Sequence, residues 1–155
     1  MTAHRLLRLA DAPEHLKTIA EWNHTQWGAA AGRSLSDCVD RFRDVIRKTS
    51  EECVIAERDG TVLGMACLVD HDLEDRPDLM HWLASVYVLP EYRKDGLASA
   101  LIGAVEREAA ARNIERLHLY THTAESLYQR LGWTVCERFE LDEDAFALMI
   151  KDLRR

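Results

Sequence analysis

Val86-Tyr-Val-Leu-Pro-Glu-Tyr-Arg-Lys-Asp-Gly-Leu-Ala98 is the stretch that decides the fold of this chain. Its apolar start predicts a strand, Pro90 and Gly96 interrupt a short loop, and a helix is expected to begin at Leu97. The first N–H groups of that helix lack intrahelical partners and carry the positive end of the helix dipole. Because Gly96 lets a ligand approach the backbone closely and Ala98 keeps the next turn clear, the stretch can hold an anion such as a pyrophosphate. A glycine turn before a helix is also common for structural reasons alone, so this pattern does not by itself establish a site.

Strand and helix patterns flank this stretch on both sides. Asp59-Gly60 between two β-rich runs predicts a two-residue hairpin, and Ser34 with Asp37 three residues later predicts a helix start. Expected strands cover 4–10, 52–58, 61–69, 81–88, 115–121, 133–141 and 145–153, and expected helices cover 13–28, a segment from 34, 97–112 and 123–131, the last capped by Thr123. One strand–helix–strand unit with hairpins around it predicts a mixed α/β domain with a single twisted sheet. The length of 155 residues and the lack of a linker predict one domain over 1–155.

The composition is that of a globular protein, with 47% apolar and 30% charged residues. The 20 basic and 27 acidic residues give a net charge of −7. This charge argues against general nucleic-acid binding, which needs a basic face, and weakly favours an amine substrate. No apolar run has the length of a membrane span and the N-terminus carries no secretory signal, so we expect no membrane partner and a cytoplasmic location.

The cysteines and histidines do not form a metal-binding pattern. None of the cysteines at 38, 53, 67 and 136 belongs to a Cys-x-x-Cys pair, and each has apolar neighbours. We therefore expect buried free thiols and neither a zinc site nor disulfides. His118 and His122 are four residues apart, but the sequence offers no third ligand, so no metal is expected.

Two motifs, in this order and at this spacing, resemble the GNAT superfamily of acyl-CoA-dependent N-acyltransferases. The first is Val86-x-Val88-x-Pro90 followed by Arg93-x-x-Gly96-x-Ala98 and Leu101, and the second is Ala124-Glu-Ser-Leu-Tyr128-Gln-Arg-Leu-Gly-Trp133. The resemblance implies a central twisted, mostly antiparallel sheet of about seven strands with four helices. It also implies that acetyl-coenzyme A (acetyl-CoA) is the co-substrate and that its acetyl group passes directly to an amine.

The resemblance further assigns the residues that would hold acetyl-CoA. The pantetheine arm enters between the splayed fourth and fifth strands and pairs with the fourth strand, here through Val86, Tyr87 and Val88. The pyrophosphate cradle would consist of Arg93, Lys94, Asp95, Gly96, Leu97 and Ala98. Thr121 stands where many relatives carry an asparagine. Asp95 departs from the family pattern, and its carboxylate would repel a pyrophosphate unless the side chain points to solvent.

Tyr128 matches the tyrosine that serves as general acid in the family, where it returns a proton to the departing thiolate. The alternative is a tyrosine that only packs beside Leu127 and Leu131. The general base is less clear, because the strand from His81 carries no carboxylate where many relatives have a glutamate. His81 has a suitable ordinary pKa but lies at the start of the strand. The other candidate bases are the carboxylates of the preceding loop, Asp72, Glu74 and Asp75.

The tryptophans near the expected acceptor site can be interpreted in two ways. Trp22 and Trp27 lie on or near the first helix, which usually lines the acceptor site in this family, and they could form an aromatic wall for an amine. Core packing is the alternative for each of them and for Trp82.

The resemblance therefore implies that the chain is an N-acetyltransferase. It would move the acetyl group of acetyl-CoA to a primary amine of a small molecule. Two alternatives stay open: acetylation of peptide or protein N-termini, and a non-catalytic acyl-CoA-binding sensor. A purely nucleotide-binding domain is disfavoured, because a doubly wound fold would alternate strands and helices throughout. Dimers are common in the family, so a homodimer is a further expectation of the resemblance.

Overall fold

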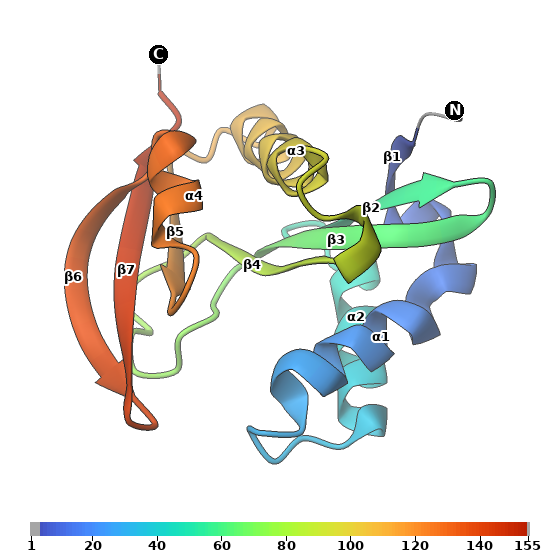
Figure 1. The fold of residues 1–155 in the computed structure, drawn as a ribbon, viewed down its shortest axis with the longest axis horizontal. Helices are drawn as coiled ribbons and strands as arrows, with labels where there is room; N and C mark the ends of the chain where they lie inside the picture. The colour runs from blue at the N-terminus through green and yellow to red at the C-terminus, as the bar shows by residue number, and fades with distance from the viewer. Residues whose placement is uncertain (1–3, 155) are drawn as a thin grey trace.

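The computed structural model describes residues 4–154 of the chain (Figure 1). The expected domain over 1–155 includes residues 1–3 and 155, which lie outside the described part. Within the described part the elements are β1 (Arg5–Arg8), α1 (Leu16–Asn23), α2 (Leu35–Arg47), β2 (Glu52–Arg58), β3 (Thr61–Val69), β4 (Trp82–Val88), α3 (Leu97–Ala111), β5 (Arg116–Thr121), α4 (Glu125–Arg130), β6 (Thr134–Leu141) and β7 (Asp144–Asp152). No helix in residues 4–154 is long and apolar enough to cross a membrane.

The strands form one sheet in the order β1-β2-β3-β4-β5-β7-β6. Every neighbouring pair is antiparallel except β4 and β5, which are parallel. The parallel pair is joined by the crossover through α3, as a parallel connection requires. The sequence prediction of a mixed α/β domain with a mostly antiparallel twisted sheet is confirmed.

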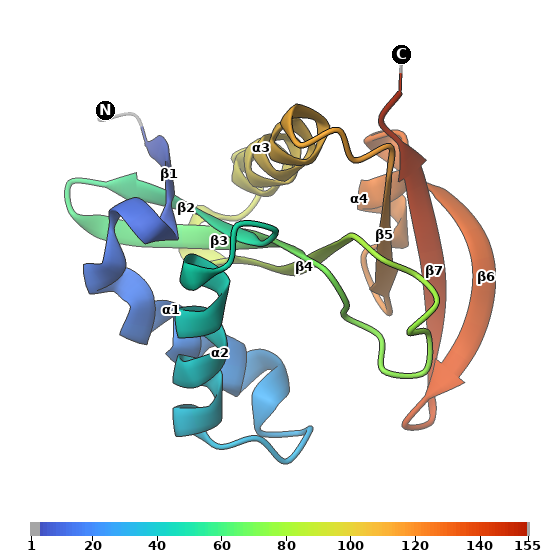
Figure 2. The same cartoon turned by 180° about the vertical axis from the view of Figure 1, so that it is seen from behind.

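The junction between β4 and β5 divides the sheet into two halves. The only register pair between the two strands is Trp82 with His118, next to a hydrogen bond from the His118 N–H to the His81 carbonyl at 3.0 Å. Beyond this point the strands diverge, and Figures 1 and 2 show the β1–β4 half turned steeply away from the β5–β7–β6 half. Most of β4 therefore has no strand partner on the β5 side.

Two hydrophobic cores lie on opposite faces of the sheet, as the views from both sides show (Figures 1 and 2). One core packs α3 and α4 against the sheet and contains the fully buried Leu101 and Ile102 together with Tyr128 and Trp133. The other packs α1 and α2 against the opposite face and contains Ile19, Phe42 and Trp82. The sheet thus separates an α3–α4 face, which carries the expected coenzyme cradle, from an α1–α2 face.

Several local predictions hold. The β2–β3 hairpin has the predicted bounds, with Asp59 and Gly60 at positive φ in its turn. Ser34 and Asp37 form a reciprocal capping box, in which the Asp37 N–H donates to Ser34 Oγ at 3.0 Å and the Ser34 N–H donates to the Asp37 carboxylate at 2.9 Å.

Other local predictions need correction. The helix expected over 13–28 is a 3₁₀ turn at Pro13–His15, then α1, then a π-helical turn at His24–Gly28, where the Ala29 N–H bonds the His24 carbonyl five residues back. Thr123 does not cap α4; instead the Thr121 hydroxyl accepts a hydrogen bond from the Ala124 N–H at 3.1 Å.

The expectation of four buried thiols is also wrong at one position. Cys38, Cys53 and Cys67 are buried free thiols, but Cys136 is exposed. Cys136 lies on β6, an edge strand whose residues are mostly exposed or half-buried, so apolar neighbours in sequence did not place it in a core.

The tight approach of β3 to β4 and α3 makes a first prediction. A Cβ added at Gly64 would lie 2.9 Å from the Tyr87 carbonyl oxygen and 3.0 Å from Leu101 Cδ1. We therefore expect Gly64→Ala to lower the free energy of unfolding by about 1–3 kcal/mol, as overpacking typically does. The measurement is urea denaturation followed by circular dichroism.

Gly103→Ala is the matched control for this prediction. Gly103 lies inside α3, and its added Cβ would meet only the Arg107 guanidinium at 3.3 Å. Because alanine favours a helix interior over glycine, the control should be neutral or stabilising by up to about 1 kcal/mol. Equal stability of the two variants would contradict the close packing of β3 on β4 and α3.

Candidate active site

A bulge in β4 lies at the centre of the site. Met65 pairs with Tyr87 and Cys67 pairs with Ala84, so Ser85 and Val86 together face the single residue Ala66. Ser85 takes up the extra length with φ of 55°, a value that few non-glycine residues adopt. Its hydroxyl accepts a hydrogen bond from the side-chain amide of Asn23 at 3.3 Å, which ties the end of α1 to the bulge.

Beyond the bulge, β4 presents backbone groups along its open edge. The Leu89 N–H donates to the Leu63 carbonyl of β3 at 2.9 Å. Because backbone groups alternate in direction along a strand, Val88 and Val86 face the opposite edge, where β5 has diverged. Tyr87 faces β3 with its backbone, and its ring packs against Trp22 at 5.2 Å and under the Arg93 guanidinium at 5.5 Å.

The cradle forms a turn at the start of α3, the helix that follows β4. Gly96 is the N-cap in the left-handed region with φ of 79°, and Lys94 is also left-handed with φ of 72°. Leu97 buries its side chain in the α3–α4 core and Ala98 is half-buried, so these two residues offer their N–H groups to a ligand and not their side chains.

Of the charged side chains around the cradle, one is bonded to the backbone of β4 and two are exposed to solvent. The Arg93 guanidinium donates to the Val88 carbonyl at 2.8 Å, which fixes the loop against the end of β4. Lys94 and Asp95 are exposed. An exposed Asp95 can direct its carboxylate to water, so its presence is compatible with an anion held by the backbone of the turn.

Tyr128 lies on α4 at the other end of the open gap. It is only 7% exposed, and its ring meets Trp133 edge to face at 6.1 Å. Burial raises the pKa of the Tyr128 phenol to about 12. The phenol therefore keeps its proton at neutral pH, as a proton donor must. Thr121, which precedes α4, accepts a hydrogen bond through its hydroxyl oxygen from the N–H of Ala124, the N-cap residue of that helix.

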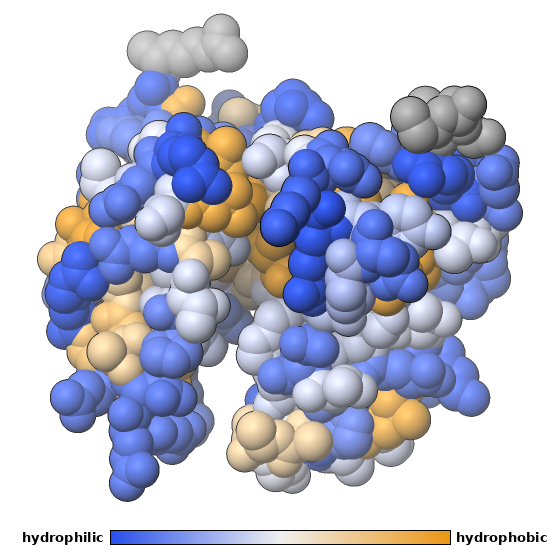
Figure 3. Space-filling model, in the orientation of Figure 1, coloured by the Kyte–Doolittle hydropathy of each residue, from blue (hydrophilic) through white to orange (hydrophobic). Residues whose placement is uncertain are grey.

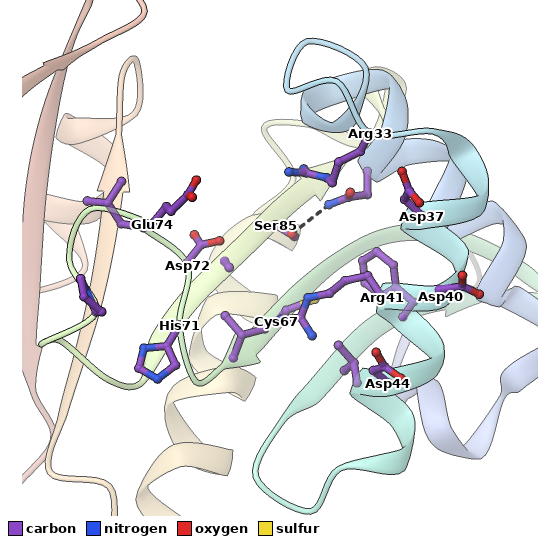
Figure 4. A pocket seen from close by; sticks show the side chains of 17 residues that line it. Arg33, Asp37, Asp40, Arg41, Asp44, Cys67, His71, Asp72, Glu74 and Ser85 are labelled. Carbon is purple, nitrogen blue, oxygen red and sulfur yellow. Dashed lines mark hydrogen bonds between the residues drawn. The ribbon is translucent and has the colours of Figure 1, made fainter.

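A cavity of about 680 Å³ opens on the α1–α2 face. The space-filling view shows the molecule hollowed between the β6–β7 hairpin and the α1–α2 pair (Figure 3). Residues of five regions line the cavity: the end of α1, α2 and the loop before it, β3, the loop between β3 and β4, and β4 through Ala84 and Ser85. Figure 4 shows Asp72 and Glu74 on one wall and Arg33 and Arg41 on the other, with Ser85 between them. The cavity thus reaches the backbone of β4 from the side opposite to α3 and α4.

Asp72 is the carboxylate of this cavity whose pKa is raised toward neutral pH. Its side chain reaches the water of the cavity, but the surrounding protein desolvates the carboxylate and raises its pKa to about 6. The positive charges of Arg41 and Arg33 act in the opposite direction and keep the pKa from rising further. A carboxylate with a pKa near 6 is ionised at pH 7 and is basic enough to take a proton.

His81 lies away from this constellation. It precedes Val86 by five residues, which is roughly 15 Å along a strand, and it does not line the cavity. Its carbonyl accepts from the His118 N–H at 3.0 Å and contacts His118 Nδ1 at 3.2 Å, so His81 closes the joint between β4 and β5. Of the loop carboxylates, Asp72 and Glu74 line the cavity and Asp75 does not.

The remaining candidates divide between packing and the surface. Trp82 is fully buried in the α1–α2 core, Trp22 packs on Tyr87, and Trp27 is 40% exposed. His122 contacts the Ala145 carbonyl through Nδ1 at 2.7 Å, and burial lowers the pKa of His118. No group of three or more potential metal ligands occurs among residues 4–154.

Sequence reasoning missed four residues of this site: Asn23, Arg33, Arg41 and Ser85. They come from α1, the loop before α2, α2 itself and β4, and no local motif joins them. Only the fold brings them together. A serine in the middle of an apolar strand was the one local signal that could have indicated the bulge.

Comparison with known proteins agrees with this geometry. The model of the Acetyltransferase (GNAT) family matches residues 16–133. The amino-acid acetyltransferase of Haemophilus ducreyi is 29% identical over 103 residues, which cover 66% of this chain and 23% of that protein. The amino-acid acetyltransferase of Actinobacillus pleuropneumoniae serotype 3 is 28% identical over 106 residues, with 68% and 23% covered. The matched part of this chain thus spans less than a quarter of the length of these curated relatives.

Solved structures share the fold over nearly the whole chain. An aminoglycoside 6'-N-acetyltransferase complexed with coenzyme A superimposes with a TM-score of 0.76 at 12% identity, covering 97% of this chain and 98% of that one. An N-acetyltransferase from Staphylococcus aureus Mu50 gives a TM-score of 0.75 at 17% identity, covering 99% and 100%. At these identities the likeness concerns the fold alone.

The family match covers most of the chain and includes both the β4–α3 cradle and Tyr128. The chain belongs to the acetyltransferase (GNAT) family.

Proposed function

We propose that this chain is an N-acetyltransferase that moves the acetyl group of acetyl-CoA directly to a primary amine of a small molecule. The observation that carries the proposal is the gap between β4 and β5, with a free edge of β4 inside it, the Gly96 turn of α3 following β4 and α4 with Tyr128 following β5. Unpaired backbone groups on a strand edge suit an extended ligand with amide groups, which is the chemistry of pantetheine.

Acetyl-CoA would be held entirely by groups on the open edge and the following turn. The backbone of Val86 and the N–H of Val88, whose carbonyl is bonded to Arg93, would pair with the pantetheine amides, and the N–H groups from Gly96 to Ala98 would hold the pyrophosphate. A bulge N–H at Ser85 or Val86 would stabilise the oxyanion that forms when the amine attacks the thioester carbonyl. Arg93 and Lys94 would add positive charge beside the phosphates.

The proton transfers to Asp72 and from Tyr128 would take place on opposite faces of the sheet. The acceptor would react as its neutral amine, after its ammonium form has released one proton to water. Its nitrogen would bond to the acetyl carbon and pass a second proton to Asp72 in the cavity, and the carbon–sulfur bond would break. Tyr128 would then give its proton to the departing thiolate. One proton enters the protein and one leaves it, so the protein returns to its starting charge after Tyr128 and Asp72 re-equilibrate with water.

The size of the cavity supports a small-molecule acceptor. Its volume of about 680 Å³ lies within the usual range for small-ligand sites, about 300–1,000 Å³. The relatives named amino-acid acetyltransferases and the structural neighbours named for aminoglycosides and spermidine also act on small amines by name. Because Cys38, Cys53, Cys67 and Cys136 are all free thiols, as is usual in reducing compartments, we propose a cytoplasmic enzyme.

Tyr128→Phe tests the general acid. The change removes only the hydroxyl, so acetyl-CoA should bind with an unchanged Kd in calorimetry while kcat falls by about a hundredfold or more. Tyr92→Phe is the control, since Tyr92 stacks under Arg58 outside the site. A Tyr128→Phe enzyme with the kcat of the unmodified protein would remove Tyr128 from the mechanism, and a non-catalytic sensor would show no turnover in any variant.

Asp72→Asn tests the general base through pH dependence. With its pKa at about 6, Asp72 loses its basic form as the pH falls, so kcat/KM of the unmodified enzyme should fall below about pH 6. In Asp72→Asn this acid limb should vanish and kcat should drop at all pH values. Asp75→Asn, on the same loop but outside the cavity, should keep the limb.

The thermal stability of Asp72→Asn shows whether a loss of activity comes from the missing base or from unfolding of the variant. Because the folded state holds the proton of Asp72 more tightly than an ordinary aspartate does, the ionised carboxylate destabilises the fold above about pH 6. The asparagine variant should therefore have an equal or higher Tm at pH 8. An unchanged acid limb in a folded Asp72→Asn enzyme would assign the base to another group.

A further inference from the structure

Charged side chains of both signs meet in the acceptor cavity. Figure 4 shows Asp72 and Glu74 reaching in from the β3–β4 loop, while Arg33 and Arg41 reach in from the loop before α2 and from α2. The two guanidinium groups lie close enough to Asp72 to lower its pKa through their charge. The part of the cavity nearest to the β4 bulge is therefore polar and carries opposite charges side by side.

Arg41 is fixed by a carboxylate beneath it. Its guanidinium donates to both oxygens of Glu51, at 2.9 and 3.4 Å. The Glu51 side chain is only 2% exposed, and it also accepts the Asp70 N–H at 2.9 Å. This network offsets most of the charge of Arg41 and holds the side chain in place, so Arg41 forms a rigid wall of the cavity.

Arg33 differs from its neighbours because its charge is not offset. Arg41 pairs with Glu51 and Arg43 pairs with Asp40 at 3.5 Å, whereas Arg33 makes no ion pair or side-chain hydrogen bond within residues 4–154. Figure 4 shows its guanidinium extending over the cavity above Ser85. A planar guanidinium in such a position is suited to bind a carboxylate through two parallel hydrogen bonds.

Some of the acidic residues that line the cavity along α2 already have partners within the protein. Asp37 is occupied by the capping box with Ser34. Asp40 pairs with Arg43, and Figure 4 shows it pointing away from the cavity. Of the carboxylates near the bulge, Asp72 is needed as the base in the proposed function. Among the lining residues, Asp44, Asp72 and Glu74 form no ion pair within residues 4–154, and Arg33 is the arginine that forms none.

We propose that the acceptor is a zwitterion, an amino acid whose amine meets Asp72 at the bulge and whose carboxylate binds Arg33. The inference rests on the proposed acetyl transfer and names its acceptor class. Arg33 is exposed and has no ion-pair partner within residues 4–154, so a carboxylate that binds it gains charge-assisted hydrogen bonds that an uncharged analogue cannot make. Arg33 is thus the residue that determines specificity, and it takes no part in the proton transfers.

The test compares α- and ω-amino acids with their own carboxamides in an assay of thiol release from acetyl-CoA. The amide keeps the size of the acid and removes only its charge. It also makes the neighbouring amine less basic, so more of the amine is free to react, and any preference for the acid must come from the protein. For the best acceptor we expect kcat/KM of the acid to exceed that of the amide by about tenfold or more, as for loss of one charge-assisted hydrogen bond.

Two arginine variants test whether Arg33 causes the preference for the acid over the amide. Arg33→Gln should bring the acid and the amide to equal kcat/KM, while Arg43→Gln, which alters an arginine outside the cavity, should leave the ratio unchanged. Arg41→Gln is not suitable, because it would leave the buried Glu51 without its main partner and could unfold the protein.

The outcomes separate the two proposals. Amides or spermidine turned over as well as the acids would overturn the zwitterion inference and leave the acetyl transfer standing. A preference for the acid that survives Arg33→Gln would also overturn it. Absence of thiol release with every amine, in a protein that binds acetyl-CoA, would refute the proposed function itself.

Discussion

The single register pair between β4 and β5 is the constraint on which the rest of the site depends. Two parallel strands that stayed paired would bury their backbone groups in the sheet and leave nothing for a ligand. Here the pairing ends after Trp82 and His118, so the Val86 N–H and carbonyl and the Val88 N–H lack a strand partner, while the Val88 carbonyl accepts from Arg93. Backbone groups without partners are costly when they are removed from water. A ligand that supplies amide groups in an extended shape would complete the sheet, and this is the role that the account gives to pantetheine.

The bulge at Ser85 links this gap to the cavity on the α1–α2 face. It bends β4 at the point where the strand both lines the cavity and begins its open edge. The two titrating groups then lie on opposite sides of that point, and both have a raised pKa because of burial. The consequences differ: Asp72 becomes basic enough to accept a proton near neutral pH, whereas Tyr128 keeps its proton. The same physical effect thus produces a base on one face and an acid on the other.

Most strands and helices could be predicted from the sequence because each is specified by a local pattern of residues. The alternating strands and the Asp59-Gly60 turn gave β2 and β3 their correct bounds, and Ser34 with Asp37 marked the start of α2. The cradle and Tyr128 could also be proposed from the sequence, since each belongs to a contiguous motif. The acceptor side could not, because Asn23, Arg33, Arg41 and Ser85 meet only in the folded chain. Asp72 was one of several loop carboxylates in the sequence, and only its desolvated place in the cavity distinguishes it from Asp75.

Amide hydrogen exchange along β4, with and without acetyl-CoA, tests the central claim most directly. The Val86 and Val88 N–H groups face the gap, while the Leu89 N–H is bonded to the Leu63 carbonyl and serves as an internal reference. The account predicts that acetyl-CoA slows exchange at Val86 and Val88 and changes Leu89 little. Tight binding of acetyl-CoA with unaltered exchange at Val86 and Val88 would show that the ligand does not pair with β4, and would contradict the account.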